Sequence, residues 1–159
     1  LNNQLTDFRF APHAADGRLH PNRIQPGKRP LSSMSPIIAL DPEDQPRLII
    51  GSPGGTRIIG YVAQRVADVL MQGNDVKAAI EAGNLINRNG RTEVEADTRA
   101  EALVPGLEAL GHETEVDAMT SGLHGIERLP NGVIRGAADP RREGTVGRVR
   151  LRSDEESRH

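Results

Sequence analysis

Two short aliphatic runs in the first third of the chain predict a pair of strands, because such runs bounded by turn residues are typical of paired strands. The runs are Ile37–Leu40 and Arg47–Ile50, and the turn region between them contains Pro42 and Pro46. The second run leads directly into the segment Gly51-Ser52-Pro53-Gly54-Gly55. The pattern therefore predicts a strand that ends in a glycine-rich turn.

The strongest helical periodicity in the chain follows this turn. Apolar residues recur at the spacing i, i+1, i+4, i+8, i+11 and i+12, which places them on one face of a helix. These residues are Ile58, Ile59, Val62, Val66, Val69 and Leu70. Gly73 is a typical stop signal. We predict an amphipathic helix that begins at Ile58 and ends by Gly73.

A short second helix is predicted from Asn74 through Ile80. Asn74 is a suitable N-cap residue, and Asp75 would lie in the first turn, near the positive end of the helix dipole. Gly83 is expected to close this helix.

A third helix is predicted from Thr98-Arg99-Ala100-Glu101, which has the form of a capping box. Its apolar face would contain Ala100, Leu103, Val104, Leu107 and Leu110. Pro105 lies inside this pattern and removes an interior hydrogen bond at a cost of about 3 kcal/mol, so we expect the helix to kink or restart there.

The other short apolar runs predict four more strands, and Asn131-Gly132 between the last two is a hairpin signal. The predicted strands are Thr92–Glu95 (an edge strand), His112–Asp117, His124–Leu129 and Val133–Ala137. Residues 9–27 show no apolar period and are predicted to form a long loop. Together, these helices and strands predict an α+β layered fold over residues 1–147, followed by a charged tail at residues 148–159.

Composition narrows the possible functions. The chain has 20 Lys and Arg against 22 Asp and Glu, a net charge of -2, which excludes a polycationic nucleic-acid arm. It contains no cysteine, so disulfides and thiolate catalysis are excluded. No segment has the roughly 18 consecutive apolar residues of a membrane helix. Residue 1 is leucine rather than methionine, so we expect a processed or truncated chain, with room for a signal peptide upstream.

Three groups of residues have the side chains or N–H groups needed to bind a ligand. Each group also has a purely structural interpretation. Adjacent N–H groups at Gly54 and Gly55 can bind an anion or a developing oxyanion, although an ordinary turn has the same residues. The hydroxyls of Ser32 and Ser33 can hold a carboxylate, or can satisfy local backbone groups. Gln4 and Asp7, three residues apart, can bind an ammonium group, or can be solvated surface residues.

The remaining polar residues predict no further site. The histidines lack the spacing of a metal motif, so we predict no metal site. No cofactor is expected either. The histidines are His13, His20, His112, His124 and His159. The arginine-rich end from Arg141 to Arg158 is interleaved with acidic residues, and we predict a solvated tail there.

Several motifs, in order along the chain, resemble the small-subunit portion of gamma-glutamyltranspeptidases. The similarity spans about residues 1–143. The motifs are Asn2-Asn3-Gln4, Asp7-Phe8, Pro26-Gly27-Lys28-Arg29-Pro30-Leu31-Ser32-Ser33-Met34-Ser35-Pro36, Gly51-Ser52-Pro53-Gly54-Gly55 and Gly136-Ala137-Ala138-Asp139-Pro140-Arg141.

The resemblance implies an N-terminal-nucleophile hydrolase fold, a four-layer αββα sandwich, present here only in part. In that family a precursor cleaves itself and exposes a threonine, which takes the γ-glutamyl group from glutathione or a related compound and passes it to water, an amino acid or a peptide. The partners it implies are a large subunit, the N-terminal part of the small subunit and a small γ-glutamyl substrate. Relatives are typically periplasmic, secreted or membrane-anchored.

The resemblance also implies roles for individual residues. Gln4 and Asp7 match the positions that hold the α-amino group of the γ-glutamyl moiety. Ser32 and Ser33 match those that bind its α-carboxylate, and Gly54-Gly55 matches the oxyanion-hole pair. The loop at residues 9–27 corresponds to a lid over the site in some members.

Two features depart from the family pattern. The nucleophilic threonine belongs to a stretch upstream of Leu1, so we expect the chain alone to be inactive. The family commonly has Ala-Pro-Arg and a histidine after the second helix, where this chain has Ala82-Gly83-Asn84-Leu85-Ile86-Asn87. Two alternatives stay open: an acylase of the same fold acting on glutaryl-type cephalosporin side chains, and a non-catalytic module that binds a small anion or amino acid.

Overall fold

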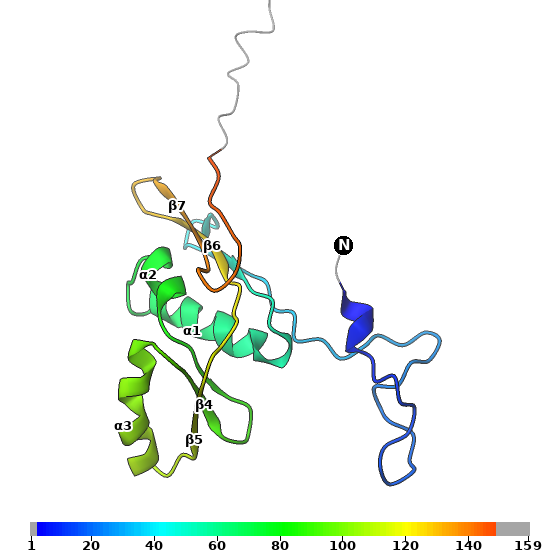
Figure 1. Cartoon of the computed structure of the whole chain (residues 1–159). Coiled ribbons are helices and arrows are strands. Elements are labelled where there is room, and N and C mark those ends of the chain that lie inside the picture. The colour runs from blue at the N-terminus through cyan, green and yellow to red at the C-terminus, as the bar shows by residue number, and fades with distance from the viewer. Residues whose placement is uncertain (1–2, 149–159) are drawn as a thin grey trace, which may run out of the picture.

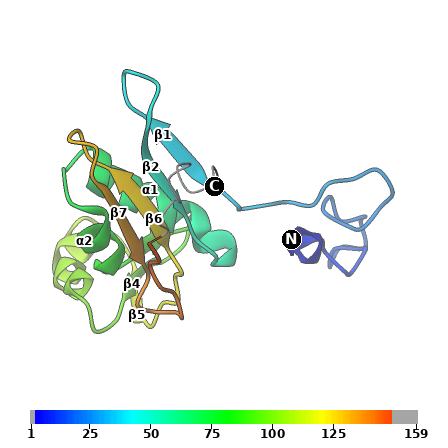
Figure 2. The same cartoon turned by 90° about the horizontal axis from the view of Figure 1, so that it is seen from above.

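The computed structural model describes residues 3–148 (Figure 1), and its larger sheet has four antiparallel strands, which lie side by side in Figure 2. The strands lie in the order β1-β2-β6-β7, so two sequence-distant hairpins are joined at the middle of the sheet. Their bounds are β1 (Ile37–Leu40), β2 (Pro46–Gly51), β6 (His124–Arg128) and β7 (Ile134–Ala138). The predicted strand pair and the predicted hairpin are confirmed.

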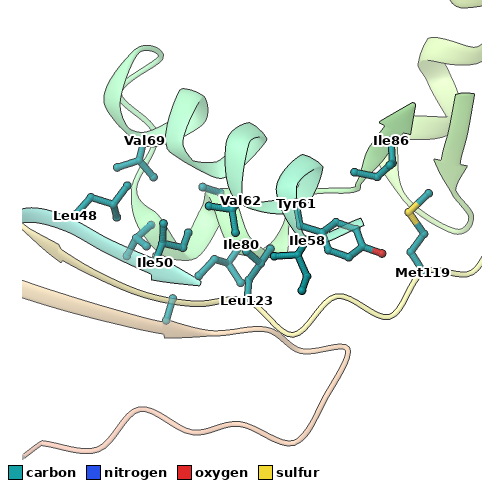
Figure 3. Packing of buried hydrophobic residues seen from close by; sticks show 13 residues of the cluster. Leu48, Ile50, Ile58, Tyr61, Val62, Val69, Ile80, Ile86, Met119 and Leu123 are labelled. Atoms are coloured by element: carbon teal, nitrogen blue, oxygen red, sulfur yellow. The ribbon is translucent and has the colours of Figure 1, made fainter. Parts of the chain in front are cut away.

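Helices α1 (Ile58–Leu70) and α2 (Val76–Glu81) cover one face of this sheet and enclose the core (Figure 3). Alternate residues of β2, Leu48 and Ile50, point into that core, whereas Ile49 between them faces away and is exposed. The largest contributions from the helices are Tyr61, Val62, Val69, Val76 and Ile80. Each fully buried aliphatic side chain stabilises the fold by about 1.5–3 kcal/mol. Tyr61 adds an aromatic ring beside the glycine-rich turn.

A second, three-stranded sheet, in the order β3-β4-β5, lies near the N-terminal end of α1, where Ile86 of β3 packs against Gly60 (Figure 1). The strands are β3 (Leu85–Asn87), β4 (Thr92–Glu95) and β5 (Thr114–Asp117); β3 and β4 are antiparallel, and β4 and β5 are parallel. The prediction that residues 92–95 form an edge strand is wrong. They form the central strand, because Leu85–Asn87 adds a strand that the sequence pattern did not indicate.

The parallel pair is connected by a 3-10 helix, η3 (Arg99–Leu103), that continues as α3 (Val104–Ala109). Pro105 lies in the first turn of α3, so the predicted restart is confirmed. Thr98 caps η3 by accepting a hydrogen bond from the Ala100 N–H (3.2 Å). Of the predicted apolar face, Ala100 is buried, whereas Leu103 and Leu110 are exposed.

The second helix differs in detail from its prediction. Its N-cap is Asp75 rather than Asn74, because the Asp75 carboxylate accepts a hydrogen bond from the Ala78 N–H (2.9 Å). The helix ends at Glu81, and the closing role predicted for Gly83 is wrong. A Cβ atom on Gly83 would lie 2.2 Å from Thr98 Oγ1, so glycine there permits a close approach between segments.

Residues 3–36 form an arm that extends away from the helices and sheets in both views (Figures 1 and 2). The arm contains one short helix, η1 (Gln4–Asp7), and a long loop. Two isolated bridges hold this loop, Arg9 with Arg23 and His13 with Leu19. The predicted loop at residues 9–27 is confirmed, and so is the α+β class. Among residues 3–148, no helix is long and apolar enough to cross a membrane.

Candidate functional site

A pocket of about 350 Å³ lies where the arm meets the glycine-rich turn. Three segments that are distant in the sequence line it: η1, the residues just before β1, and the turn after β2. The lining residues are Asn3, Asp7, Leu31, Ser33, Met34, Ser52, Pro53, Gly54, Gly55, Thr56 and Ile58. The pocket therefore brings together Asp7, Ser33 and the glycine pair.

Gly54 and Gly55 adopt different left-handed conformations in this turn. The φ of Gly54 is +139°, and a Cβ atom there would lie 2.8 Å from Cε2 of the buried Tyr61 ring. The φ of Gly55 is +58°, and a Cβ atom there would meet no atom of the described residues within 4 Å. Gly54 is thus required by both conformation and packing, whereas Gly55 is required by conformation alone.

The two serines before β1 are placed differently. Ser33 lines the pocket. Ser32 lies outside the lining, and its Oγ accepts a hydrogen bond from the Met34 N–H (3.2 Å). This contact fits the alternative interpretation, in which the serine hydroxyls satisfy local backbone groups. Gln4 likewise lies outside the lining, although it shares the single turn of η1 with Asp7.

Asn22 joins the two parts of the arm that reach the pocket. Its Nδ2 donates to the Asp7 carbonyl oxygen (2.7 Å), and its Oδ1 accepts from the Leu31 N–H (2.8 Å). The side chain therefore sets the distance between η1 and the serine segment. Sequence reasoning did not identify Asn22, because a polar residue after a proline in a long loop has no periodic signal.

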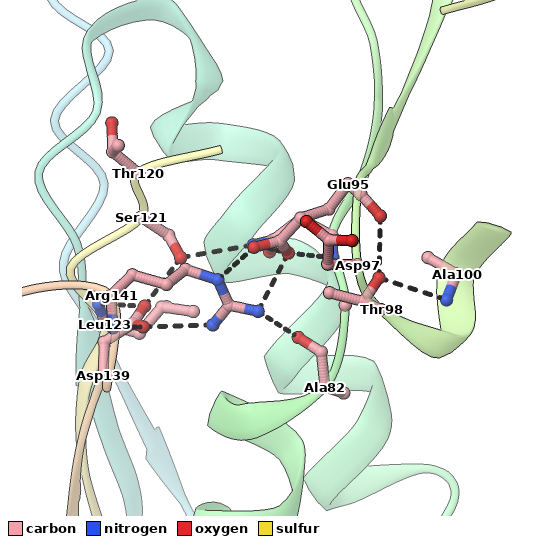
Figure 4. Close-up of polar contacts among 12 residues, drawn as sticks. Ala82, Glu95, Asp97, Thr98, Ala100, Thr120, Ser121, Leu123, Asp139 and Arg141 are labelled. Atoms are coloured by element: carbon pink, nitrogen blue, oxygen red, sulfur yellow. Dashed lines mark hydrogen bonds and ion pairs between the residues drawn. The ribbon is translucent and has the colours of Figure 1, made fainter. Parts of the chain in front are cut away.

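Behind the turn, a buried polar network links the two sheets (Figure 4). The Arg141 guanidinium pairs with both carboxylate oxygens of Glu95, one at 2.8 Å, and with Asp139 Oδ1 at 3.0 Å. It also donates to the carbonyl oxygens of Ile80 (3.1 Å) and Ala82 (2.9 Å), at the end of α2. The predicted solvated tail is therefore wrong at Arg141, and residues 149–158 lie outside the described part of the chain.

Asp139 is the centre of this network on the side of the four-stranded sheet. Its Oδ2 accepts from the Ser121 hydroxyl (2.6 Å) and the Leu123 N–H (3.0 Å). Burial alone would raise the pKa of the Asp139 carboxyl, but these bonds and those from Arg141 outweigh burial and lower the pKa below its ordinary value. Asp139 is thus held as an anion beside a cation.

Asn84, in the segment after α2, completes the network. Its Nδ2 donates to Glu95 Oε2 (2.9 Å) and to Ser121 Oγ (3.2 Å), and its backbone N–H also reaches Glu95 Oε2 (2.8 Å). The segment after α2 is therefore fixed by a buried amide. Within residues 3–148, no three His, Asp or Glu side chains form a cluster able to hold a metal ion.

Comparison with known proteins gives consistent matches. A family model described as gamma-glutamyltranspeptidase matches residues 1–149. The glutathione hydrolase proenzyme of Bacillus subtilis strain 168 is 33% identical over 156 residues, which cover 96% of this chain and 25% of that protein. The chain thus spans about a quarter of the length of such curated relatives.

Solved structures show the same likeness. An acivicin-inhibited gamma-glutamyltranspeptidase matches with a TM-score of 0.75 and 31% identity, covering 91% of this chain and 81% of that chain. A cephalosporin acylase from Bacillus halodurans matches with a TM-score of 0.73 and 26% identity, covering 91% of this chain and 26% of that chain.

Proposed function

The chain belongs to the gamma-glutamyltranspeptidase family, with an N-terminal-nucleophile hydrolase fold present in part, and from this premise we propose a role in γ-glutamyl transfer. The complete protein would move the γ-glutamyl group of glutathione or a related compound to water, an amino acid or a peptide. These 159 residues would supply the donor pocket and the oxyanion hole. A threonine from outside them would supply the nucleophile.

One observation supports the proposal most strongly. Asp7, Ser33 and the Gly54-Gly55 pair come from three separate segments and line one pocket. A carboxylate, a hydroxyl and adjacent N–H groups are complementary to an ammonium, a carboxylate and a developing oxyanion. The volume of about 350 Å³ lies within the range of small-molecule sites.

In the proposed arrangement, different residues bind the α-amino group and the α-carboxylate of the γ-glutamyl group. Asp7, with Gln4 beside it on η1, holds the α-amino group. Ser33, with Ser32 next to it, holds the α-carboxylate. The γ-carbonyl then points toward Gly54 and Gly55, whose N–H groups stabilise the negative charge that develops on its oxygen.

The chemistry follows the logic of an activated nucleophile with its own base. The threonine hydroxyl attacks the γ-carbonyl carbon, and its proton passes to the threonine α-amino group. The tetrahedral intermediate collapses as the C–N bond breaks, and the departing amine takes that proton. Water or an amine acceptor then attacks the threonyl ester by the same steps in reverse order. Loss of one oxyanion-hole donor in such reactions costs about 3 kcal/mol.

The rest of the protein would supply the layers of the αββα sandwich that these residues do not form. The face of the four-stranded sheet opposite α1 and α2 exposes Ile38, Ile49 and Ile126. We propose that the large subunit and the N-terminal part of the small subunit cover this face, because several exposed apolar side chains on one sheet face are typical of an interface. Localisation outside the cytoplasm stays an expectation from the resemblance.

The test of the donor pocket uses the full-length protein and a chromogenic γ-glutamyl anilide. We expect Asp7→Ala to lower kcat/KM by roughly 10- to 150-fold, the effect of losing a hydrogen bond between charged groups. Asp16→Ala is the matched control, since Asp16 contacts Arg18 and lies outside the pocket lining. Equal activity of the two variants would contradict the assigned role, and turnover by the 159 residues alone would contradict the external nucleophile.

The acylase is the second candidate, because the Bacillus halodurans cephalosporin acylase and the acylase ACY 1 proenzyme of Pseudomonas sp. SE83 match the chain. A glutaryl donor has no α-amino group, so Asp7 would have no cation to bind. A γ-glutamyl transferase should lose activity in Asp7→Ala. An acylase should retain its activity toward glutaryl substrates in the same variant.

A further inference from the structure

A second cavity is linked to the donor pocket by a hydrogen bond between side chains of the two linings. It has a volume of about 380 Å³, and its lining residues are Arg88, Gly90, Arg91, Glu93 and Glu115. Thr56 lines the donor pocket, and Arg88 Nη1 donates to Thr56 Oγ1 over 2.6 Å. The Arg88 guanidinium therefore lies at the border between the pocket and the second cavity.

Two arginines share one carboxylate at this border. Arg57 Nε lies 2.5 Å from Glu93 Oε2, and Arg88 Nη2 contacts Glu93 Oε1. The hydrogen bond with Glu93 raises the pKa of Arg57, and the same bond lowers the pKa of Glu93, so this bond favours the charged form of both groups. Two positive charges and one negative charge leave this cluster with one unbalanced positive charge.

Arg88 is the arginine of this pair that contacts a residue lining the donor pocket. Its side chain is held by Glu93 on one side and by Thr56 on the other. The Thr56 hydroxyl accepts a hydrogen bond from Arg88 and can still donate its own hydrogen. A hydroxyl and a guanidinium side by side are complementary to a carboxylate.

We propose that Arg88 and Thr56 bind the terminal carboxylate of the peptide part of the substrate. This part is the leaving group of a γ-glutamyl peptide, or the incoming peptide acceptor. The proposal rests on the proposed function, because that function places the γ-glutamyl group in the pocket lined by Thr56. Glu115 repels an anion within the second cavity, so the carboxylate binds at the Thr56–Arg88 contact.

The local fold explains how this chain presents an arginine here. Arg88 directly follows β3 in the sequence. β3 pairs with β4, which places Asn87 opposite Thr92. Its neighbour Ile86 is buried against Gly60 of α1. These contacts carry Arg88 to the start of α1, beside Thr56.

The experiment compares two substrates that differ by one charge, glutathione and glutathione amidated at its C-terminus. For the full-length protein we expect kcat/KM to favour the free acid about three- to tenfold, the range of a partly exposed hydrogen-bonded ion pair. In Arg88→Gln this preference should disappear, chiefly through KM, while turnover of the amide stays within about twofold. Arg88→Lys should restore part of the preference.

Arg91→Gln is the matched control, because Arg91 lines the same cavity but pairs with Glu113, away from Thr56. It should keep the preference for the free acid. The proposal is overturned if Arg88→Gln keeps that preference, if it loses activity equally on both substrates, or if Arg91→Gln loses the preference to the same extent. Failure of the proposed function would be distinct: the unmodified full-length protein would then turn over neither substrate.

Discussion

The two walls of the pocket are held in place by different forces. The inner wall, Ser52 to Ile58, is fixed by packing, because Gly54 lies against the buried ring of Tyr61 and Ile58 is itself in the core. The outer wall, with Asp7 and Ser33, is exposed or half-buried and is linked by the hydrogen bonds of Asn22. The wall proposed to stabilise the oxyanion is thus part of the fold, whereas the wall proposed to select the donor is attached to it.

This difference leads to a general expectation. Substitutions behind the inner wall should lower the free energy of unfolding and activity together, since the wall cannot move without the core. Substitutions in the arm should raise KM with little effect on stability, because few apolar contacts are lost there.

The largest effect is expected from Arg141→Met. It leaves the buried carboxylates of Glu95 and Asp139 without their cation, which costs about 3–5 kcal/mol. The network reaches the inner wall through Ser121 and its neighbour Gly122, whose N–H donates to Ser52 Oγ (3.2 Å). Thermal unfolding of the full-length protein should show a greatly lowered Tm. Arg142→Met, which loses only bonds to the Thr120 carbonyl, should keep a nearly normal Tm.

The second largest effect is a difference in unfolding free energy between alanine variants of the two glycines in the inner wall. Gly54→Ala forces a methyl group into contact with Tyr61 and should cost about 1–3 kcal/mol from overpacking, in addition to strain from its positive φ. Gly55→Ala meets only the left-handed φ and should cost about 1–2 kcal/mol. Urea unfolding of both variants checks this order. A larger loss for Gly55→Ala would show that Tyr61 does not restrict the turn.

A smaller effect is expected from Asn22→Ala in the arm. Loss of two hydrogen bonds between η1 and the serine segment should raise KM for a γ-glutamyl anilide about tenfold, while the Tm stays close to that of the unmodified protein. Asn131→Ala, which removes a side-chain bond to the Val133 N–H in a hairpin turn, is the control and should leave KM unchanged. Unchanged KM in Asn22→Ala would contradict a link between Asn22 and the pocket.

The smallest effect concerns acid stability. The pKa of Asp139 is lower in the folded state than its ordinary value of about 3.9, so its contribution is complete above that pH and is lost as the pH falls through the folded-state value. Tm should therefore fall as the pH is lowered below about 4, and it should fall less steeply in Asp139→Asn. Asp16→Asn, in an exposed ion pair, should follow the slope of the unmodified protein.

Patterns within a short window predicted much of the fold. The apolar period predicted the start of α1 at Ile58, although the helix ends at Leu70, three residues before Gly73, and Asn131-Gly132 marked the hairpin between β6 and β7. β3 was missed because a strand of three residues is too short to show alternation, and it is stabilised instead by pairing with β4 and by burial of Ile86. The N-cap of α2 was displaced by one residue, since Asn74 and Asp75 are both good caps.

Contacts over long sequence distances could not be predicted in this way. Arg141 was interpreted as part of a solvated tail because alternating charges look alike whether exposed or paired, and its partner Glu95 lies 46 residues away. The pairing of Arg88 with Thr56 across 32 residues likewise has no local signal. Of the six residues proposed from motifs, four share the pocket, and Gln4 and Ser32 lie beside it.

A structure of the full-length protein with bound L-glutamate is the most direct measurement of the donor pocket. We expect the α-amino group at Asp7, the α-carboxylate at Ser33, and the γ-carboxylate within hydrogen-bond distance of the Gly54 and Gly55 N–H groups. Glutamate bound in the reverse orientation, or at a site that touches none of these residues, would contradict the account.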